Sequence, residues 1–155
     1  MTRKIISVVV INEHSVLARV SGLFAGRGYN IESLTVAPIP ESNLSRITIA
    51  THGEARVLEQ IIKQLHKLIP VLEVSDNDDF LEKESVLIKI SIEEDLASIE
   101  ALARAYNGKI ANANEKYIII VATEKPHRIT SLIKAMSRFK PKEIVRSGVI
   151  AMERY

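Results

Sequence analysis

Hydrophobic and polar residues in the first half of the chain follow two different periods. Residues 3–11 are mostly β-branched, which is typical of a strand. Val16, Val20 and Phe24 instead recur at the spacing of a helix with one buried face. Extended along the chain, the two periods predict six elements in the order β-α-β-β-α-β, at residues 3–11, 15–26, 30–38, 45–51, 54–68 and 71–75.

The second half repeats this order. Val86, Ile88 and Ile90 alternate with Leu87 and Lys89, as in a strand with one inward face. The repeat predicts strands at 86–92, 109–113, 117–123 and 143–152, one helix between Asp95 and Asn107, and one helix that carries Ile129 to Met136. An antiparallel sheet with both helices on one face is the ferredoxin-like fold. The predicted fold class is therefore α+β, with two such domains in tandem.

A charged segment separates the two halves. Residues 76–84 hold six acidic or basic side chains among few apolar ones. This composition predicts a linker at 78–84 between a first domain at 1–77 and a second at 85–155. Phe80 and Leu81 interrupt the charge, and we expect them to pin the linker to one domain.

Composition narrows the class of protein. Of the 155 residues, 46% are apolar and 5% aromatic, so two small cores are possible and both must be aliphatic. No run of about 18 or more uncharged apolar residues occurs, so we expect no membrane span. The N-terminus lacks the features of a signal peptide. The absence of cysteine excludes disulfides and thiol chemistry and fits a cytoplasmic location.

The polar residues predict neither a catalytic site nor a metal site. The four histidines have no ligand-like spacing, and without cysteine a zinc site is not expected. Acidic residues 93–95 precede a predicted helix, where carboxylates stabilise the positive end of the helix dipole. The pair Gly26 and Gly28 follows a helix, which is the wrong context for a dinucleotide-binding turn. We therefore expect a non-enzymatic chain with no cofactor of its own.

Nucleic-acid binding is the main rival class, because RNA-binding modules share the β-α-β-β-α-β order. Residues 85–155 hold 12 Lys or Arg against 8 Asp or Glu. The basic excess gathers at six positions, Arg128, Lys134, Arg138, Lys140, Lys142 and Arg146. Such a surface fits an acidic partner, nucleic acid or simply a solvated face. RNA-binding modules stack bases on aromatic residues of the central strands. Here those strands offer only Tyr117, so we expect no nucleic acid.

The segment from Arg27 to Pro38 is the most informative stretch. The preceding helix ends at Gly26-Arg27-Gly28, where glycine tolerates the left-handed backbone that stops a helix. The next strand opens with Asn30, whose carboxamide donates and accepts hydrogen bonds at once. A carboxamide at this position suits the binding of a zwitterion.

These residues also carry a family resemblance. The segments concerned are Asn12-Glu13 with Leu17 and Arg19-Val20, then Arg27–Pro38 and Leu44-Ser45-Arg46, and more weakly Arg146–Val149. Together they resemble the regulatory small subunit of acetolactate synthase. The resemblance implies an ACT domain that binds a branched-chain amino acid, most simply valine. An ACT-type amino-acid sensor for another enzyme is the alternative.

What the resemblance implies about partners is specific. The chain would be a non-catalytic partner that activates the large catalytic subunit and confers feedback inhibition. Thiamine diphosphate, a divalent metal and FAD would belong to that large subunit. The effector would bind between one subunit and its neighbour, at Asn12, Ser15, Val16 and Leu17 of one chain and Asn30 and Ile31 of the other.

Physical chemistry supports the first half of that site. Backbone N–H groups at a helix start are unpaired and attract an anion such as the carboxylate of an amino acid. The family usually has glycine where this chain has Ser15, so the approach of the ligand and its identity are in question. Alternatively, Asn12 and Ser15 simply cap the helix.

The second predicted strand offers a dimer interface. It lies at the edge of a ferredoxin-like sheet, and residues 31–37 carry only Glu32 as a charge. Such an edge is poorly protected against pairing with another chain. Two copies paired along it would form a continuous eight-stranded sheet. We therefore expect a homodimer that brings Asn30 to the helix start of its neighbour.

Overall fold

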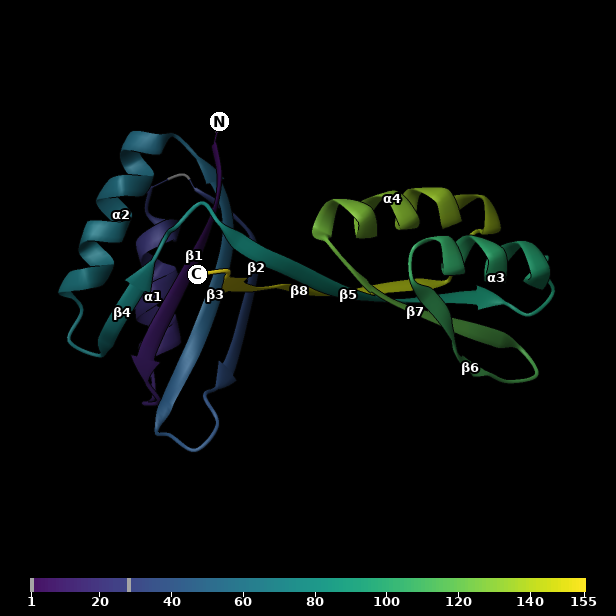
Figure 1. Cartoon of the computed structure of the whole chain (residues 1–155), viewed down its shortest axis with the longest axis horizontal. Coiled ribbons are helices and arrows are strands. Elements are labelled where there is room, and N and C mark those ends of the chain that lie inside the picture. The colour runs from purple at the N-terminus through teal and green to yellow at the C-terminus, as the bar shows by residue number, and fades with distance from the viewer. Residues whose placement is uncertain (1, 28) are drawn as a thin grey trace. The chain divides into compact units, whose positions relative to one another are not determined.

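The computed structural model describes residues 2–27 and 29–155, which form two compact units (Figure 1). Unit 1 comprises Met1–Leu81 together with Val149–Tyr155, and unit 2 comprises Glu82–Gly148. Each unit holds one four-stranded antiparallel sheet with two helices. The predicted α+β class and the repeated β-α-β-β-α-β order are confirmed.

Unit 1 contains the six predicted elements. These are β1 (Thr2–Ile11), α1 (Val16–Ala25), β2 (Asn30–Pro38), β3 (Leu44–Gly53), α2 (Ala55–Lys67) and β4 (Val71–Ser75). The strand order is β2-β3-β1-β4, so β2 lies at an edge, as predicted. Strand β1 pairs along its whole length with β3, from Thr2 opposite Gly53 to Ile11 opposite Leu44.

The core of unit 1 lies between the sheet and its two helices (Figure 1). Alternate residues of the central strands point to this side, because successive side chains of a strand face opposite ways. The buried set is Ile6, Val8, Val10, Val16, Val20, Phe24, Tyr29, Ile47, Ile49, Leu58, Ile61 and Leu65. Ten of these twelve side chains are aliphatic, which fits the low aromatic content.

The opposite face of the same sheet is also covered. Ile5 and Ala50 point away from the helices, and both are buried against Phe80, Val149 and Ala151. Two hydrogen bonds hold the main chain of Val149 there. Its carbonyl accepts from Thr35 Oγ1 at 3.0 Å, and its N–H donates to Ser33 Oγ at 3.2 Å. Two segments far along the chain thus complete the first unit.

Unit 2 is built in the same way. Its elements are β5 (Phe80–Ser91), α3 (Leu96–Ala105), β6 (Gly108–Ala113), β7 (Tyr117–Glu124), α4 (Pro126–Met136), a 3-10 turn (Ser137–Phe139) and β8 (Glu143–Glu153). The first two residues of β5 and the last five of β8 belong to unit 1. The strand order is β6-β7-β5-β8. Asp95 begins α3 by accepting a hydrogen bond from the Ser98 N–H at 3.3 Å. Asn107, at a positive φ of 58°, follows the helix end as predicted.

Two sequence-based expectations differ from the structure. Residues 80–84 of the predicted linker belong to β5, and the two units divide at 81/82 and at 148/149 rather than at 78–84 alone. The reason is that Phe80 is buried while Asp78 binds Lys4 Nζ at 2.8 Å, so both side chains hold the segment to unit 1. The second difference concerns the left-handed backbone expected at the glycines that end the first helix. Gly26 has φ −79°, an ordinary right-handed value. Gly28 lies outside the described residues.

Phe80 gives a direct test of this arrangement. Phe80→Ala should lower the free energy of unfolding by about 3 kcal/mol, because it removes a large side chain from a small buried cluster. Leu81→Ala is the matched control: Leu81 is 42% exposed, so the loss should stay below about 1 kcal/mol. Urea unfolding followed by circular dichroism measures both. Equal effects of the two substitutions would contradict the role given to Phe80.

Candidate functional site

The loop between β1 and α1 forms the first half of the candidate site. The Asn12 N–H donates to the carbonyl of Asn43 at 2.9 Å, which anchors the loop while the Asn12 residue stays exposed. Ser15 precedes α1 at φ 70° and ψ −5°, in the left-handed region. A Cβ is unfavourable there, so this backbone explains why the resembling family usually has glycine at this position.

The N-terminus of α1 is not capped by a side chain. Ser15 is the N-cap residue, yet its hydroxyl makes no capping hydrogen bond, and the first turn holds no acidic residue. Among the described residues, the one hydrogen-bond partner of Ser15 is Arg19, whose N–H donates to the Ser15 carbonyl at 3.0 Å. The alternative that Ser15 merely caps the helix with its side chain is therefore not observed. The positive end of the dipole remains available to an anion.

Val16 and Leu17 play different parts. The Val16 side chain is 4% exposed and belongs to the core, so only its backbone faces the loop. Leu17 is 43% exposed. The helix start therefore presents backbone donors beside one exposed aliphatic side chain.

Asn30 and Ile31 form the second half of the candidate site. Asn30 opens β2 and is exposed, and its carbonyl accepts from Thr51 Oγ1 at 2.9 Å. Among the described residues, none bonds to its carboxamide. Ile31 is half-buried and packs against the core of unit 1. The backbone of Asn30 is fixed while its side chain remains free to bind.

Tyr29 fixes the start of β2, and sequence reasoning missed it. Its ring is 8% exposed, and its hydroxyl donates to the carbonyl of Glu54. Burial raises the pKa of this phenol. The ring lies against Gly53, where a Cβ would come within 1.5 Å of Tyr29 Cε1. A glycine at the end of β3 is the one sequence signal that marks this close approach.

Within one chain, the two halves of the candidate site lie far apart. Asn30 pairs with His52, which pairs with Arg3, whereas Asn12 follows Ile11 at the other end of β1. The eight steps along the strand from Arg3 to Ile11 span about 27 Å. One chain therefore cannot close both halves around a small ligand.

Glu32, the only charge within 31–37, is balanced inside unit 1. Its carboxylate lies 3.1 Å from Arg3 Nε and 3.1 Å from His52 Nε2. Partial burial disfavours the charged form, but the hydrogen bond to His52 and the charge of Arg3 outweigh it and lower the pKa of Glu32. Glu32 is therefore a compensated rather than an isolated charge on the edge strand.

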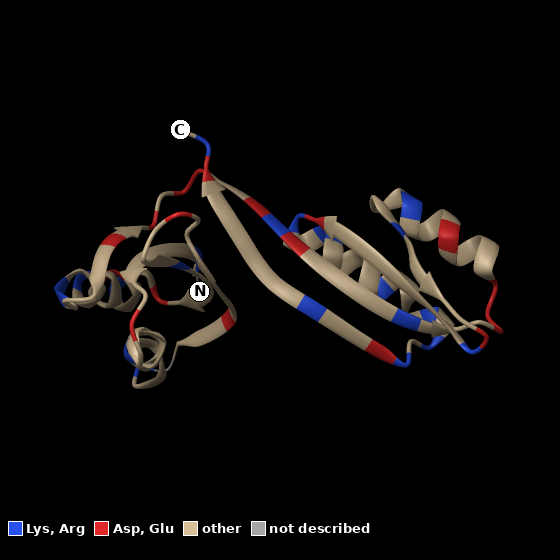
Figure 2. Ribbon diagram, turned by 90° about the horizontal axis from the view of Figure 1, so that it is seen from below, with Lys and Arg blue, Asp and Glu red and all other residues tan. Residues whose placement is uncertain are grey.

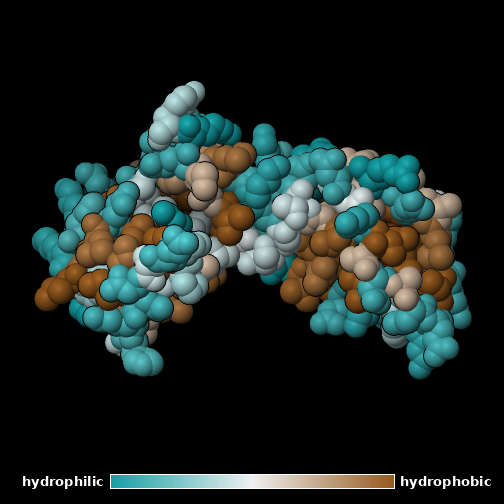
Figure 3. Space-filling view, turned by 60° about the horizontal axis from the view of Figure 1, so that its bottom comes forward, coloured by the Kyte–Doolittle hydropathy of each residue, from teal (hydrophilic) through white to brown (hydrophobic). Residues whose placement is uncertain are grey.

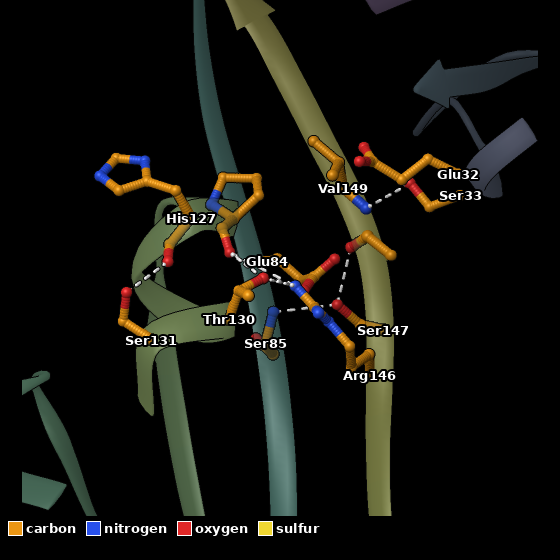
Figure 4. A network of polar contacts seen from close by, with 12 residues as sticks. Glu32, Ser33, Glu84, Ser85, His127, Thr130, Ser131, Arg146, Ser147 and Val149 are labelled. Atoms are coloured by element: carbon orange, nitrogen blue, oxygen red, sulfur yellow. Dashed lines mark hydrogen bonds and ion pairs between the residues drawn. The ribbon is translucent and has the colours of Figure 1, made fainter. Parts of the chain in front are cut away.

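Some of the basic residues of unit 2 are engaged internally. Figure 2 shows Lys and Arg interspersed with Asp and Glu along its helices and strands. Arg146 Nε donates to the buried Glu84 at 2.6 Å, and its Nη2 lies 3.1 Å from Thr130 Oγ1 (Figure 4). Arg128 lies over the ring of Tyr106, 4.7 Å from the centroid. These contacts stabilise the unit, so two of the six basic positions have a structural explanation.

The described part of the chain offers neither a metal centre nor a membrane-spanning helix. In the described ranges, no group of three or more His, Cys, Asp or Glu is placed to hold a metal ion. No helix of those ranges is long and apolar enough to cross a membrane. Tyr117, the aromatic residue considered for base stacking, lies on β7, and Lys89 Nζ is 5.7 Å from the centroid of its ring.

The comparisons with known proteins decide the family. A model described as the AHAS small subunit-like ACT domain matches residues 6–73, and one described as the small subunit of acetolactate synthase matches residues 83–155. The acetolactate synthase small subunit of Buchnera aphidicola is 40% identical, over 98% of this chain and 98% of its own. The chain belongs to the family of acetolactate synthase regulatory small subunits.

Other members of the acetolactate synthase small-subunit family agree. The isozyme 3 small subunit of Escherichia coli is 38% identical over 98% of this chain and 96% of its own. The crystal structure of the Thermotoga maritima small subunit superposes with a TM-score of 0.89 at 33% identity, covering 100% of this chain and 99% of that one. The first half is accordingly an ACT domain.

Gly53→Ala tests the anchor of β2 in this ACT domain. The added methyl group collides with the Tyr29 ring, so the free energy of unfolding should fall by about 2–3 kcal/mol. Gly22→Ala is the control: nothing lies within 4 Å of a Cβ there, and alanine should stabilise α1 by up to about 1 kcal/mol. Thermal denaturation measures both. A neutral Gly53→Ala would show that Tyr29 does not need this space.

Proposed function

We propose that this chain is the non-catalytic regulatory subunit of an acetolactate synthase and binds valine between two ACT domains. The observation that carries the proposal is the uncapped N-terminus of α1 beside the left-handed Ser15. A helix start without its own acidic residue or capping hydroxyl favours an external carboxylate.

The remaining groups suit the other parts of an amino acid. The free carboxamide of Asn30 from the neighbouring chain accepts a hydrogen bond from the ammonium group through its oxygen. Leu17 and the neighbour's Ile31 are aliphatic and not fully buried, so a branched side chain can contact them. The effector set is then Asn12, Ser15, Val16 and Leu17 with Asn30 and Ile31 of the second chain.

A homodimer through β2 brings these groups together. Strand β2 pairs only with β3 among the described strands and is therefore an open edge. Antiparallel pairing about Leu34 would set Asn30 of one copy near Pro38 of the other. Pro38 lies opposite Ser45, close to the end of β1 from which Asn12 follows. Two effector sites per dimer result from the two-fold symmetry.

The regulated partner is the large catalytic subunit, in the cytoplasm. Thiamine diphosphate, a divalent metal and FAD belong to that subunit, and this chain activates it and transmits feedback inhibition. Valine must bind differently to the active and the inhibited assembly. A coupling of about 1–3 kcal/mol is enough, and the effect on binding is reciprocal.

Asn30→Ala tests the second half of the site. Removing one polar partner of the ammonium group should weaken valine binding about 10-fold, or about 1.4 kcal/mol, without changing the fold. Isothermal titration calorimetry of the purified chain with valine, leucine and isoleucine measures affinity and stoichiometry, which we expect to be one site per chain. Sedimentation of the same sample checks for the dimer. Full binding by a stable monomer would contradict the interface.

Ser15→Asp tests the first half. An aspartate at the helix start places a like charge against the ligand carboxylate and should abolish valine binding and feedback inhibition of the reconstituted holoenzyme. Ser15→Gly is the matched control. It relieves the left-handed backbone, should stabilise the chain by about 1 kcal/mol, and should keep binding. Retained inhibition in Ser15→Asp would place the carboxylate elsewhere.

A further inference from the structure

A polar cavity lies on the sheet face of unit 1 that is turned away from the helices. Its volume is about 260 Å³. Side chains from three strands form its floor, and Phe80 and the end of β8 form its wall. The residues that line it and carry the argument are Arg46, Ser7, Glu73, Ser75, Phe80 and Glu153. None of these residues belongs to the proposed valine site.

The cation of this cavity has spare hydrogen-bonding capacity. Arg46 on β3 donates from Nη1 to Ser7 Oγ at 2.8 Å. Among the described residues no carboxylate pairs with its guanidinium. Ser7 is 3% exposed and accepts this bond, which holds the guanidinium at the cavity. A guanidinium has five N–H donors, so several remain free for a carboxylate.

Anionic groups lie across strand β1 from Arg46. Val9 on β1 pairs with Arg46 on one side and with Glu73 on the other. Arg46 and Glu73 therefore occupy the two strands that flank β1, about 10 Å apart at their backbones. Glu153 also lines the cavity and accepts from the Ser75 hydroxyl. The cavity thus has one positive and one negative side.

The wall of the cavity is partly apolar. Phe80 and Ala151 come from the two segments that cover this sheet face, and Phe80 is 8% exposed. Met152 lies beside them at the mouth and is 73% exposed. The space-filling view shows hydrophobic side chains among hydrophilic ones on the surface of unit 1 (Figure 3).

We propose that this cavity binds the zwitterion of a free aliphatic amino acid, as a second site distinct from the one at α1. The carboxylate binds Arg46, the ammonium group binds Glu73 and Glu153, and the side chain lies against Phe80 and Ala151. A cavity of about 260 Å³ is large enough to hold a free amino acid of the size of valine or leucine.

The charge pattern argues against simpler ligands. Two carboxylates repel phosphate and other anions, and Arg46 repels polyamines and metal ions. A molecule with both charges on adjacent carbons satisfies both sides at once. Such a ligand is recognised by charge-assisted hydrogen bonds at each end.

The experiment uses methyl NMR of the full-length protein labelled at its methionine methyl groups and titrated with leucine. Met152 lines the cavity, so its signal should shift with saturation. Met136 is buried in the core of unit 2 and serves as the internal control that should not move. A weak site would have a dissociation constant of about 1 mM. If the Met152 signal does not shift at a leucine concentration about 50-fold above that constant, the proposal is overturned.

Variants separate this site from the proposed valine site. Arg46→Gln and Glu73→Gln should each weaken the Met152 response about 10-fold or more. Glu73 is exposed, so its variant should fold even if Arg46→Gln does not. Asn30→Ala should leave the Met152 response intact while weakening valine binding at α1. If the Met152 shift disappears in Asn30→Ala, the shift is an indirect effect of binding at α1. That result would refute a separate site in the cavity.

Two analogues test the zwitterion. Leucinamide lacks the carboxylate, and 4-methylpentanoate lacks the ammonium group. Each should shift Met152 at least about 10-fold more weakly than leucine. Equal binding of leucinamide would make the cavity a cation site, and equal binding of 4-methylpentanoate would make it an anion site. Either result would contradict the proposal.

Discussion

The structure of unit 1 depends on a sheet that is apolar on both faces. Ile6, Val8 and Ile49 face the helices, and Ile5 and Ala50 face the other way. A sheet exposed to water on one side would leave the second set uncovered. Phe80, Val149 and Ala151 bury that set, so the first unit requires residues from beyond position 77. Phe80 and Ala151 of this cover also line the polar cavity beside Arg46, so the cavity exists only when the cover is in place.

Periodicity along the chain predicted the elements and their order, because burial of one face imposes periods of 2 and 3.6 on any sequence of this fold. The cover of the second face was harder to predict. Phe80 and Leu81 stood out as apolar residues in a charged segment, but Val149 and Ala151 lie in an ordinary strand pattern. The sequence does not reveal that the last strand, β8, is divided between the two units and that Val149 and Ala151 belong to the cover of unit 1.

The candidate site was predictable to a similar degree. Asn30 and Ser15 carry chemistry that a sequence displays, an amide at a strand start and a small polar residue at a helix start. The positive φ of Ser15 and the contact between Tyr29 and Gly53 depend on backbone geometry that side-chain type does not encode. Both features bear directly on the site. Ser15 adopts this backbone at the uncapped start of α1, and the contact between Tyr29 and Gly53 fixes the start of the strand that carries Asn30.

The two faces of the sheet give regulation a physical basis. The proposed valine site uses the edge strand β2 and the start of α1, and the cavity uses β1, β3 and β4. Thr35 and Ser33 of β2 bond to Val149, which belongs to the cover of the far face. A ligand that moves the cover therefore acts on the same strand that pairs two chains in the proposed dimer. If both ligands bind, each must change the affinity of the other by the same factor, because coupling free energy is reciprocal.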